Sequence, residues 1–212
     1  MPKIIVTGFE PFDGYSINPS EEIVKALDGT IASGYRIIGK VLPLDYNKAA
    51  QILKQSIHEN TPEYIICMGQ ANRPVITLEQ IGLNIINVKR PDNYGYKPDR
   101  FVIKEGSPAA YFSNINVHPI VDVLNSRGIP AAVSYHAGTY GCNWILFTVL
   151  DWIATGEVQA KAMFVHVPPL PQQSVEKDDS SLATMPLNIL VDTLGIIIDV
   201  ILEAESKDLE MP

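Results

Sequence analysis

The stretch IPAAVSYHAGTYGCNWILF, residues 129–147, decides the fold of this chain. Its first part predicts a strand over 131–133, because small and β-branched residues follow a glycine and a proline. The small polar segment AGT at 137–139 predicts a turn. A helix is predicted next, because apolar side chains from Trp144 onwards recur mostly three or four positions apart. A strand, a turn and a helix in this order form one unit of an α/β fold.

Cys142 falls in the first turn of this predicted helix, three residues after Thr139, which is the expected N-cap. A thiol at that place lies near unpaired backbone N–H groups and near the positive end of the helix dipole. Both features favour the thiolate, which is the reactive form of cysteine. The alternative is that Cys142 is a small core residue on an apolar helix, and this stretch alone supports the two interpretations equally.

The composition is typical of one globular α/β domain. Of the 212 residues, 46% are hydrophobic and 19% are charged, which suits a soluble protein with a sizeable core. The net charge is −8 without a basic patch, so nucleic acids and anionic membranes are poor candidate partners. Cys67 and Cys142 are too few for a disulfide framework and suit a reducing cytosol. Neither a signal peptide nor a membrane span is recognisable, so a cytoplasmic protein is expected.

Predicted strands and helices alternate along the chain. Besides the stretch above, strands are predicted over 3–7, 35–42, 62–68 and 161–167, and helices over 19–27, 46–58, 117–127 and 187–201. The alternation predicts a single α/β domain over residues 1–212, with an open, mostly parallel twisted sheet and helices on both faces. We expect segment 75–110 to depart from simple alternation and the polar tail 203–212 to fray.

Three loops carry residues of interest. The first carries Phe9 and Phe12 and is a candidate ligand pocket, because open α/β sheets bind ligands at the carboxyl ends of their strands. The alternative is that both rings only cover the edge of the sheet. Residues 90–108 form a long loop of the kind that often serves as a lid or a binding loop. A further loop, rich in proline and then polar, is predicted over 168–181.

Cofactor motifs are not recognisable in this sequence. The patterns HExxH, CxxC, GxGxxG and GxSxG do not occur, so metal ligation, dinucleotide binding and a serine nucleophile have no support. The run GYRIIGKV at 34–41 approaches a phosphate-binding loop, but valine stands where that loop needs a hydroxyl.

A cysteine and a histidine remain as candidate catalytic residues. Cys142 lies at a strand–helix junction, and His166 lies at the end of the next predicted strand. Together with a carboxylate they would form a thiol hydrolase, with a nucleophile, a base and a group that orients the base. His136 competes for the role of base. Glu79 stands in an apolar segment, where it either faces solvent or is buried with a partner. Cys67, inside a predicted strand, is expected to be an inert packed thiol.

The sequence resembles the pyrrolidone carboxyl peptidase family, the cysteine-type pyroglutamyl peptidases, over nearly its whole length. The resemblance rests on VTGFEPFDG…INPS, MGQANR…TLEQIGLN, RPDNYG, SPAAYFS, VSYHAGTYGCN and FVHVPPLPQQ, which occur in the same order as in the family. It implies that Cys142 is the nucleophile, His166 the base and Glu79 the orienting acid. It also implies a cytoplasmic enzyme, often a homotetramer, that uses no metal or other cofactor.

The same resemblance implies a pocket for the pyroglutamyl lactam ring. Its members would be Phe9, Phe12, Asn18 and the backbone of Gln70, with Arg90 and Gly141 at positions where the family lines its pocket.

Several positions depart from the family pattern. Gln80 stands where lysine or arginine is usual, Gly141 where a larger apolar residue is usual, Arg90 where isoleucine is usual, and His136 where a small residue is usual. Segment 69–79 is one residue short. We therefore expect the catalytic triad to be kept and the substrate pocket to change, with Gly141 removing part of the wall beside the nucleophile.

The sequence thus predicts a cysteine peptidase that removes an N-terminal pyroglutamyl residue from peptides. The thiolate of Cys142 would attack the pyroglutamyl carbonyl, and His166 would protonate the departing amine before water releases the acyl group. Backbone N–H groups at the start of the helix would stabilise the oxyanion. The alternatives are a related hydrolase for another small N-terminal acyl group and a binding protein on the same fold without turnover.

Overall fold

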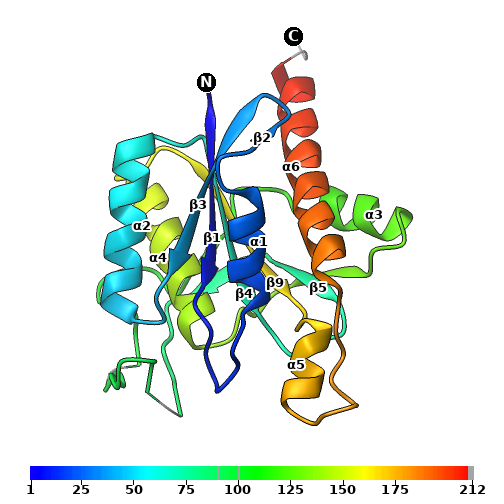
Figure 1. Ribbon diagram of the computed structural model, residues 1–212. Coiled ribbons are helices and arrows are strands. Elements are labelled where there is room, and N and C mark those ends of the chain that lie inside the picture. Colours follow the sequence, from blue (N-terminus) through cyan, green and yellow to red (C-terminus); the bar gives the residue numbers. More distant parts are fainter. Residues whose placement is uncertain (90, 100, 210–212) are drawn as a thin grey trace.

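The apolar runs of the sequence form a central sheet, and the amphipathic segments between them form helices that cover it (Figure 1). The computed structural model describes residues 1–89, 91–99 and 101–209. The strands are β1 (Lys3–Phe9), β2 (Ile31–Ala32), β3 (Tyr35–Leu42), β4 (Tyr64–Gln70), β5 (Ile76–Glu79), β6 (Ile81–Leu83), β7 (Ala110–Phe112), β8 (Ala131–Ser134) and β9 (Lys161–Val167). The helices are α1 (Pro19–Leu27), α2 (Tyr46–Asn60), α3 (His118–Ser126), α4 (Gly141–Ala154), α5 (Pro171–Glu176) and α6 (Leu187–Leu209).

The main sheet is mostly parallel, as predicted. Its strand order is β2-β3-β1-β4-β9-β5-β8. The pairs β1–β3, β1–β4, β4–β9 and β5–β8 are parallel. Two pairs are antiparallel, β2 with β3 and β5 with β9. Strands β6 and β7 form a separate antiparallel pair. Of these departures from simple alternation, the β5–β9 and β6–β7 pairings involve segment 75–110, as expected, whereas the β2–β3 pairing lies outside it.

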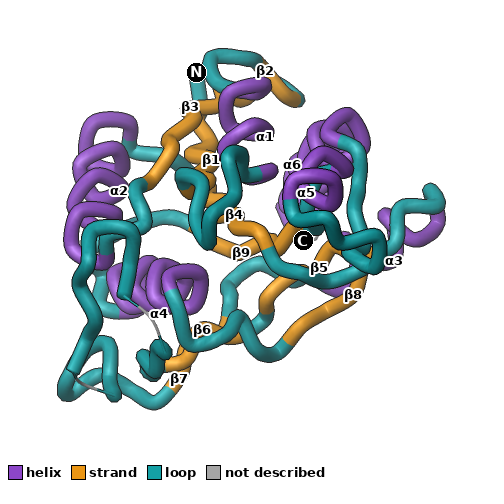
Figure 2. Tube along the Cα trace, turned by 60° about the horizontal axis from the view of Figure 1, so that its bottom comes forward, coloured by secondary structure: helices purple, strands orange, loops and turns teal. Residues whose placement is uncertain are grey.

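Helices cover both faces of the sheet. Figure 1 shows α2 and α4 on one side and α1 and α6 on the other, and Figure 2 gives the same division from a second direction. Side chains of β1 alternate between two cores. Ile4 and Val6 belong to the core that contains residues of α1 and α6, whereas Ile5 belongs to the core that contains residues of α2 and α4. Burial on both faces explains why the strands read as continuous apolar runs.

Three segments differ from the predicted elements. Helix α5 lies within the predicted loop 168–181 and begins at Pro171, a position where proline costs no hydrogen bond. Helix α6 runs to Leu209 and so includes part of the tail that we expected to fray. Extending an existing helix needs no new nucleation, so polar residues can follow its packed turns. Thr139 is not the N-cap of α4, because that position belongs to Tyr140.

Within the described ranges, no helix is both long enough and apolar enough to cross a membrane.

Candidate active site

Cys142 lies in the first turn of α4, where the predicted strand, turn and helix come together at the carboxyl edge of the sheet. Its Sγ lies against Gly69 of β4. A Cβ atom on residue 69 would be only 2.7 Å from Sγ and 3.1 Å from the ring of Phe164. Gly69 pairs with His166 across the parallel strands β4 and β9. Because Gly69 has no Cβ atom, the thiol of Cys142 can lie at the sheet edge next to the strand position of His166.

His166 is held by Glu79 from the neighbouring strand. The distance from His166 Nδ1 to Glu79 Oε1 is 2.8 Å, and both side chains are buried. This contact depends on the antiparallel pairing of β5 with β9, which places Thr77 opposite His166. A carboxylate at Nδ1 favours the tautomer that carries its proton there, which leaves Nε2 free to accept a proton.

Arg73 is a further member of this site, and sequence reasoning missed it. Its Nη1 donates to Glu79 Oε1 at 2.8 Å, to Thr77 Oγ1 at 2.6 Å and to Ser134 Oγ at 3.2 Å, and its Nη2 donates to the carbonyl oxygen of His136 at 3.0 Å. A buried carboxylate needs a partner, and this was the signal available in the sequence. The sequence does not show which cation pairs with Glu79, because the pairing depends on the tertiary structure.

Glu79 is ionised in the resting site. Burial pushes the pKa of its carboxyl up, but the hydrogen bond and charge of His166 and the charge of Arg73 push it down, and the net effect lowers it. Burial also lowers the pKa of His166, although the carboxylate of Glu79 opposes this. The pair is therefore a carboxylate and a neutral imidazole near pH 7.

The thiol of Cys142 is protonated in the resting site. Burial is the main cause and the charge of Glu79 adds to it, so the pKa rises to about 12, although Arg73 and the backbone N–H of Cys142 act in the opposite direction. The backbone N–H at the helix start lowers the pKa of this thiol, as expected, but desolvation of the charged form outweighs that effect. Cys67, by contrast, is a packed thiol at 1% exposure, as predicted.

The start of α4 keeps its backbone N–H groups free of side-chain caps. The N-cap residue Tyr140 makes no capping bond from its side chain. Thr139, which we expected in this role, donates its hydroxyl to the carbonyl of Asn87 at 2.8 Å instead. Asn143 turns away and bonds both backbone groups of Leu83, at 2.9 Å each. Uncapped N–H groups at a helix start suit an oxyanion.

A small cavity lies beside Gly141, the residue that precedes Cys142. Its lining consists of Phe9, Pro43, Leu44, Asp45, Tyr46, Ala49, Gly141 and Trp144. A Cβ atom on Gly141 would lie 2.8 Å from Leu44 Cδ1. The wall that Gly141 does not supply is therefore filled in part by Leu44, whose side chain reaches into the space that a larger residue at 141 would use.

The other predicted pocket residues have different surroundings. Phe12 is partly buried against the core that contains α2 and α4. Asn18 is fully buried as the N-cap of α1, where its Oδ1 accepts from the backbone N–H of Ser20 at 3.0 Å. The side chain of Gln70 accepts a hydrogen bond from Gln173 at 2.9 Å. Arg90 lies outside the described residues.

His136, the rival candidate for the base, is exposed. Its Nδ1 accepts a hydrogen bond from the backbone N–H of Gly138 at 3.0 Å. Its contact with the site is made by its backbone carbonyl, which binds Arg73. The imidazole in contact with Glu79 is that of His166.

Comparisons with known proteins agree with this geometry. Residues 2–204 match the pyroglutamyl peptidase family. The chain is 41% identical to pyrrolidone-carboxylate peptidase of Thermococcus onnurineus, over 95% of this chain and 100% of that protein. It is 36% identical to the protein of the same name from Bacillus thuringiensis, over 100% of this chain and 98% of the relative.

Two solved structures show the same architecture. Pyrrolidone carboxyl peptidase from Thermococcus litoralis is similar at a TM-score of 0.93 and 37% identity, with 100% of both chains covered. A mutant of the enzyme from Pyrococcus furiosus is similar at a TM-score of 0.91 and 36% identity, over 95% of this chain and 99% of the other.

Proposed function

The chain belongs to the pyroglutamyl peptidase family, and we propose that Cys142, His166 and Glu79 carry out its reaction, the removal of an N-terminal pyroglutamyl residue from peptides. The observation that carries the assignment is the 2.8 Å contact between Glu79 and His166. His166 is on β9, next to β4, and the thiol of Cys142 lies against Gly69 of β4.

The reaction begins with transfer of a proton from the thiol to the imidazole. Nε2 of His166 takes the proton as Sγ of Cys142 attacks the pyroglutamyl carbonyl carbon. The raised pKa of the Cys142 thiol makes His166 the acceptor of its proton in this step. Glu79 stabilises the imidazolium that forms, and backbone N–H groups at the start of α4 stabilise the oxyanion.

The leaving amine receives its proton from His166 as the carbon–nitrogen bond breaks, which leaves a thioester on Cys142. Water then attacks the thioester while His166 accepts a proton from it. Pyroglutamate is released and the proton returns to the thiol, so the enzyme regains its starting state.

We propose that the lactam ring of the substrate binds at the cavity beside Gly141, the residue that precedes Cys142. Phe9, Phe12 and Gly141 supply apolar contact, and Leu44 joins them as a wall. From the resemblance to the family, we assign Asn18 and the backbone of Gln70 to the polar edge of this pocket.

The enzyme acts in the cytoplasm as a homotetramer. Both cysteines are free thiols, which suits a reducing compartment. Light scattering coupled to gel filtration tests the tetramer, and a monomer at micromolar concentration would contradict it.

A fluorogenic assay tests the reaction. Wild type should release aminomethylcoumarin from its pyroglutamyl amide, and Cys142→Ser should lose turnover while keeping its circular dichroism spectrum. Cys67→Ser is the matched control and should stay active, because Cys67 is packed inside β4. Full activity of Cys142→Ser would exclude the assigned nucleophile. Faster release from an amide of a larger acyl group would favour the alternative hydrolase, and no release from any amide would favour the binding protein.

A further inference from the structure

Glu10 directly follows Phe9 at the end of β1, and each of its polar groups contacts another part of the carboxyl edge. Its backbone N–H donates to the carbonyl of Leu42 at 3.0 Å. Its backbone carbonyl accepts from Nδ2 of Asn18 at 3.0 Å. The side chain then extends towards residues that are distant in sequence.

The carboxylate of Glu10 joins two other loops. Oε1 accepts hydrogen bonds from the backbone N–H of Leu44 at 2.9 Å and from Nδ2 of Asn93 at 2.8 Å. Oε2 accepts from the hydroxyl of Tyr94 at 3.2 Å. Bonds to an ionised acceptor are stronger than bonds between neutral groups. A single side chain thus holds the loops after β1 and β3 and the segment at 93–94.

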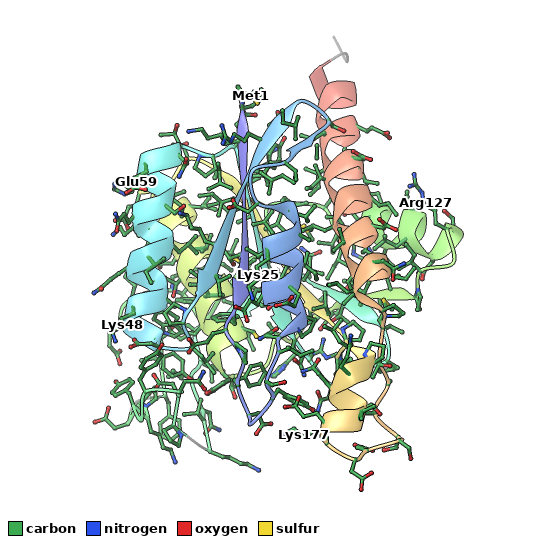
Figure 3. The ribbon with its side chains drawn as sticks, in the orientation of Figure 1. Met1, Lys25, Lys48, Glu59, Arg127 and Lys177 are labelled. Atoms are coloured by element: carbon green, nitrogen blue, oxygen red, sulfur yellow. The ribbon has the colours of Figure 1, made fainter. Side chains whose placement is uncertain are left out.

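Asn93 closes this network from the other side. Its Nδ2 also donates to the carbonyl of Pro11 at 2.9 Å, and its backbone N–H donates to the carbonyl of Leu44 at 3.2 Å. Lys48, labelled at the lower end of α2 in Figure 3, places its Nζ 4.7 Å from the centre of the Tyr94 ring. The three loops therefore form one connected unit.

Two residues of these loops are walls of the cavity beside Gly141, which directly precedes the nucleophile. Phe9 and Leu44 line it together with Gly141. We propose that Glu10 is a positioning residue for the acyl pocket, whose carboxylate holds Leu44 and the segment at 93–94 against the loop of Phe9 and so sets the width of the pocket for a lactam ring. This proposal rests on the proposed function.

The proposal predicts an effect on binding rather than on chemistry. A small ring makes few contacts, so its affinity depends on the distance between the walls. The reacting side chains come from β5, β9 and α4, and Glu10 touches none of them. A displaced wall weakens substrate and transition state alike, which raises KM and leaves kcat unchanged.

Kinetics of Glu10→Gln and Glu10→Ala on the pyroglutamyl coumarin amide test this. Glutamine keeps the size, but its NH2 group cannot accept a hydrogen bond, so one arm of the network is lost. We expect KM to rise about tenfold for Glu10→Gln and further for Glu10→Ala, with kcat within about threefold of wild type. Glu22→Gln is the matched control on α1, where Glu22 pairs with Lys25 at the surface, and its KM should not change.

A second readout does not require turnover. The bare lactam 2-pyrrolidone should protect Cys142 from iodoacetamide, and the concentration that halves the alkylation rate should rise in the Glu10 variants as KM does. Unchanged KM and unchanged protection, with only a lower melting temperature, would overturn the proposal. If wild type fails to hydrolyse the amide, the proposed function fails while the protection data still test Glu10. If Glu10→Ala does not fold, Asn93→Ala should raise KM in its place, and an unchanged KM there overturns the proposal.

Discussion

Gly141 shows how the meaning of one residue depends on its neighbour in space. In sequence, a glycine before the nucleophile suggests an open pocket. In the structure, Leu44 Cδ1 lies 2.8 Å from the position of the missing Cβ, so the wall is present but comes from another loop. The two positions share one volume, and enlarging one requires reducing the other.

We therefore predict that Gly141→Val raises KM on the pyroglutamyl amide, because overpacking typically costs roughly 1–3 kcal/mol. Leu44→Ala in the same chain should recover most of this loss, since it vacates the volume that valine needs. A double-mutant cycle measured by KM gives the coupling. Additive effects of the two changes would show that they do not share a wall.

The two histidines near the site differ in the part of the residue that they contribute. His166 presents its ring to Glu79, whereas His136 presents its carbonyl to Arg73. We predict that His166→Ala lowers kcat by roughly 10²- to 10⁴-fold, the usual contribution of a general base. His136→Ala keeps its backbone carbonyl and should retain most of the activity. Rates of the two variants, measured at equal folded concentration, distinguish them, and a larger loss in His136→Ala would reassign the base.

At the scale of elements, Arg73 connects three parts of the site. Its guanidinium contacts Glu79 and Thr77 in β5, Ser134 in β8 and the carbonyl of His136 in the segment that leads to α4. The positions of the acid and of the loop before the nucleophile therefore depend on the same side chain. Arg73 also lowers the pKa of His166 through its charge.

The pH profile should report this coupling. Burial lowers the pKa of His166 below its ordinary value of 6.5, and the imidazole must be neutral to act as a base, so kcat/KM should rise with pH through a midpoint below 6.5. Arg73→Gln removes a charge that lowers this pKa, so the midpoint should move to higher pH while kcat/KM falls roughly 10- to 100-fold. Arg127→Gln, at the exposed end of α3, is the control. A fall in activity with an unshifted midpoint would limit Arg73 to a structural role.

At the scale of the whole molecule, a buried carboxylate fastens the long connection to the core. Asp151 of α4 accepts hydrogen bonds from Lys104 Nζ at 2.5 Å, Ser107 Oγ at 2.8 Å and the hydroxyl of Tyr111 at 3.1 Å. Asp151 is 1% exposed. Segment 104–111 is otherwise mostly loop, so these bonds attach it to the helix that carries the nucleophile.

We predict that Asp151→Asn lowers the free energy of unfolding by roughly 1–3 kcal/mol at pH 7, because the amide satisfies fewer of these donors. Burial raises the pKa of Asp151, but its hydrogen bonds lower it more, so the folded value lies below the ordinary 3.8. The carboxylate thus stabilises the fold above pH 3.8, and this contribution is lost as pH falls through the folded value.

Urea unfolding between pH 7 and pH 3 measures this difference. The gap between wild type and Asp151→Asn should narrow towards pH 3. Asp122→Asn, on the exposed face of α3, should match wild type throughout. A gap that stays constant with pH would mean that the charge of Asp151 does not contribute.

The sequence by itself determined most of the strands and helices and, through its resemblance to the family, the candidate triad. Apolar runs such as residues 3–7 and 161–167 mark buried strands because both faces of the sheet are covered. The spacing of apolar residues after Cys142 determined α4. These properties are local, since the period of a pattern follows from the geometry of the element that contains it.

Only the tertiary structure decided which distant residues are in contact. The antiparallel pairing of β5 with β9 places Glu79 beside His166, and no local pattern shows the direction of a neighbouring strand. Arg73 as the partner of Glu79 and Leu44 as the wall at Gly141 are contacts between distant segments. The raised pKa of the Cys142 thiol also depends on the tertiary structure. Its helix position is visible in the sequence, but the desolvation that raises its pKa depends on every residue that packs around it.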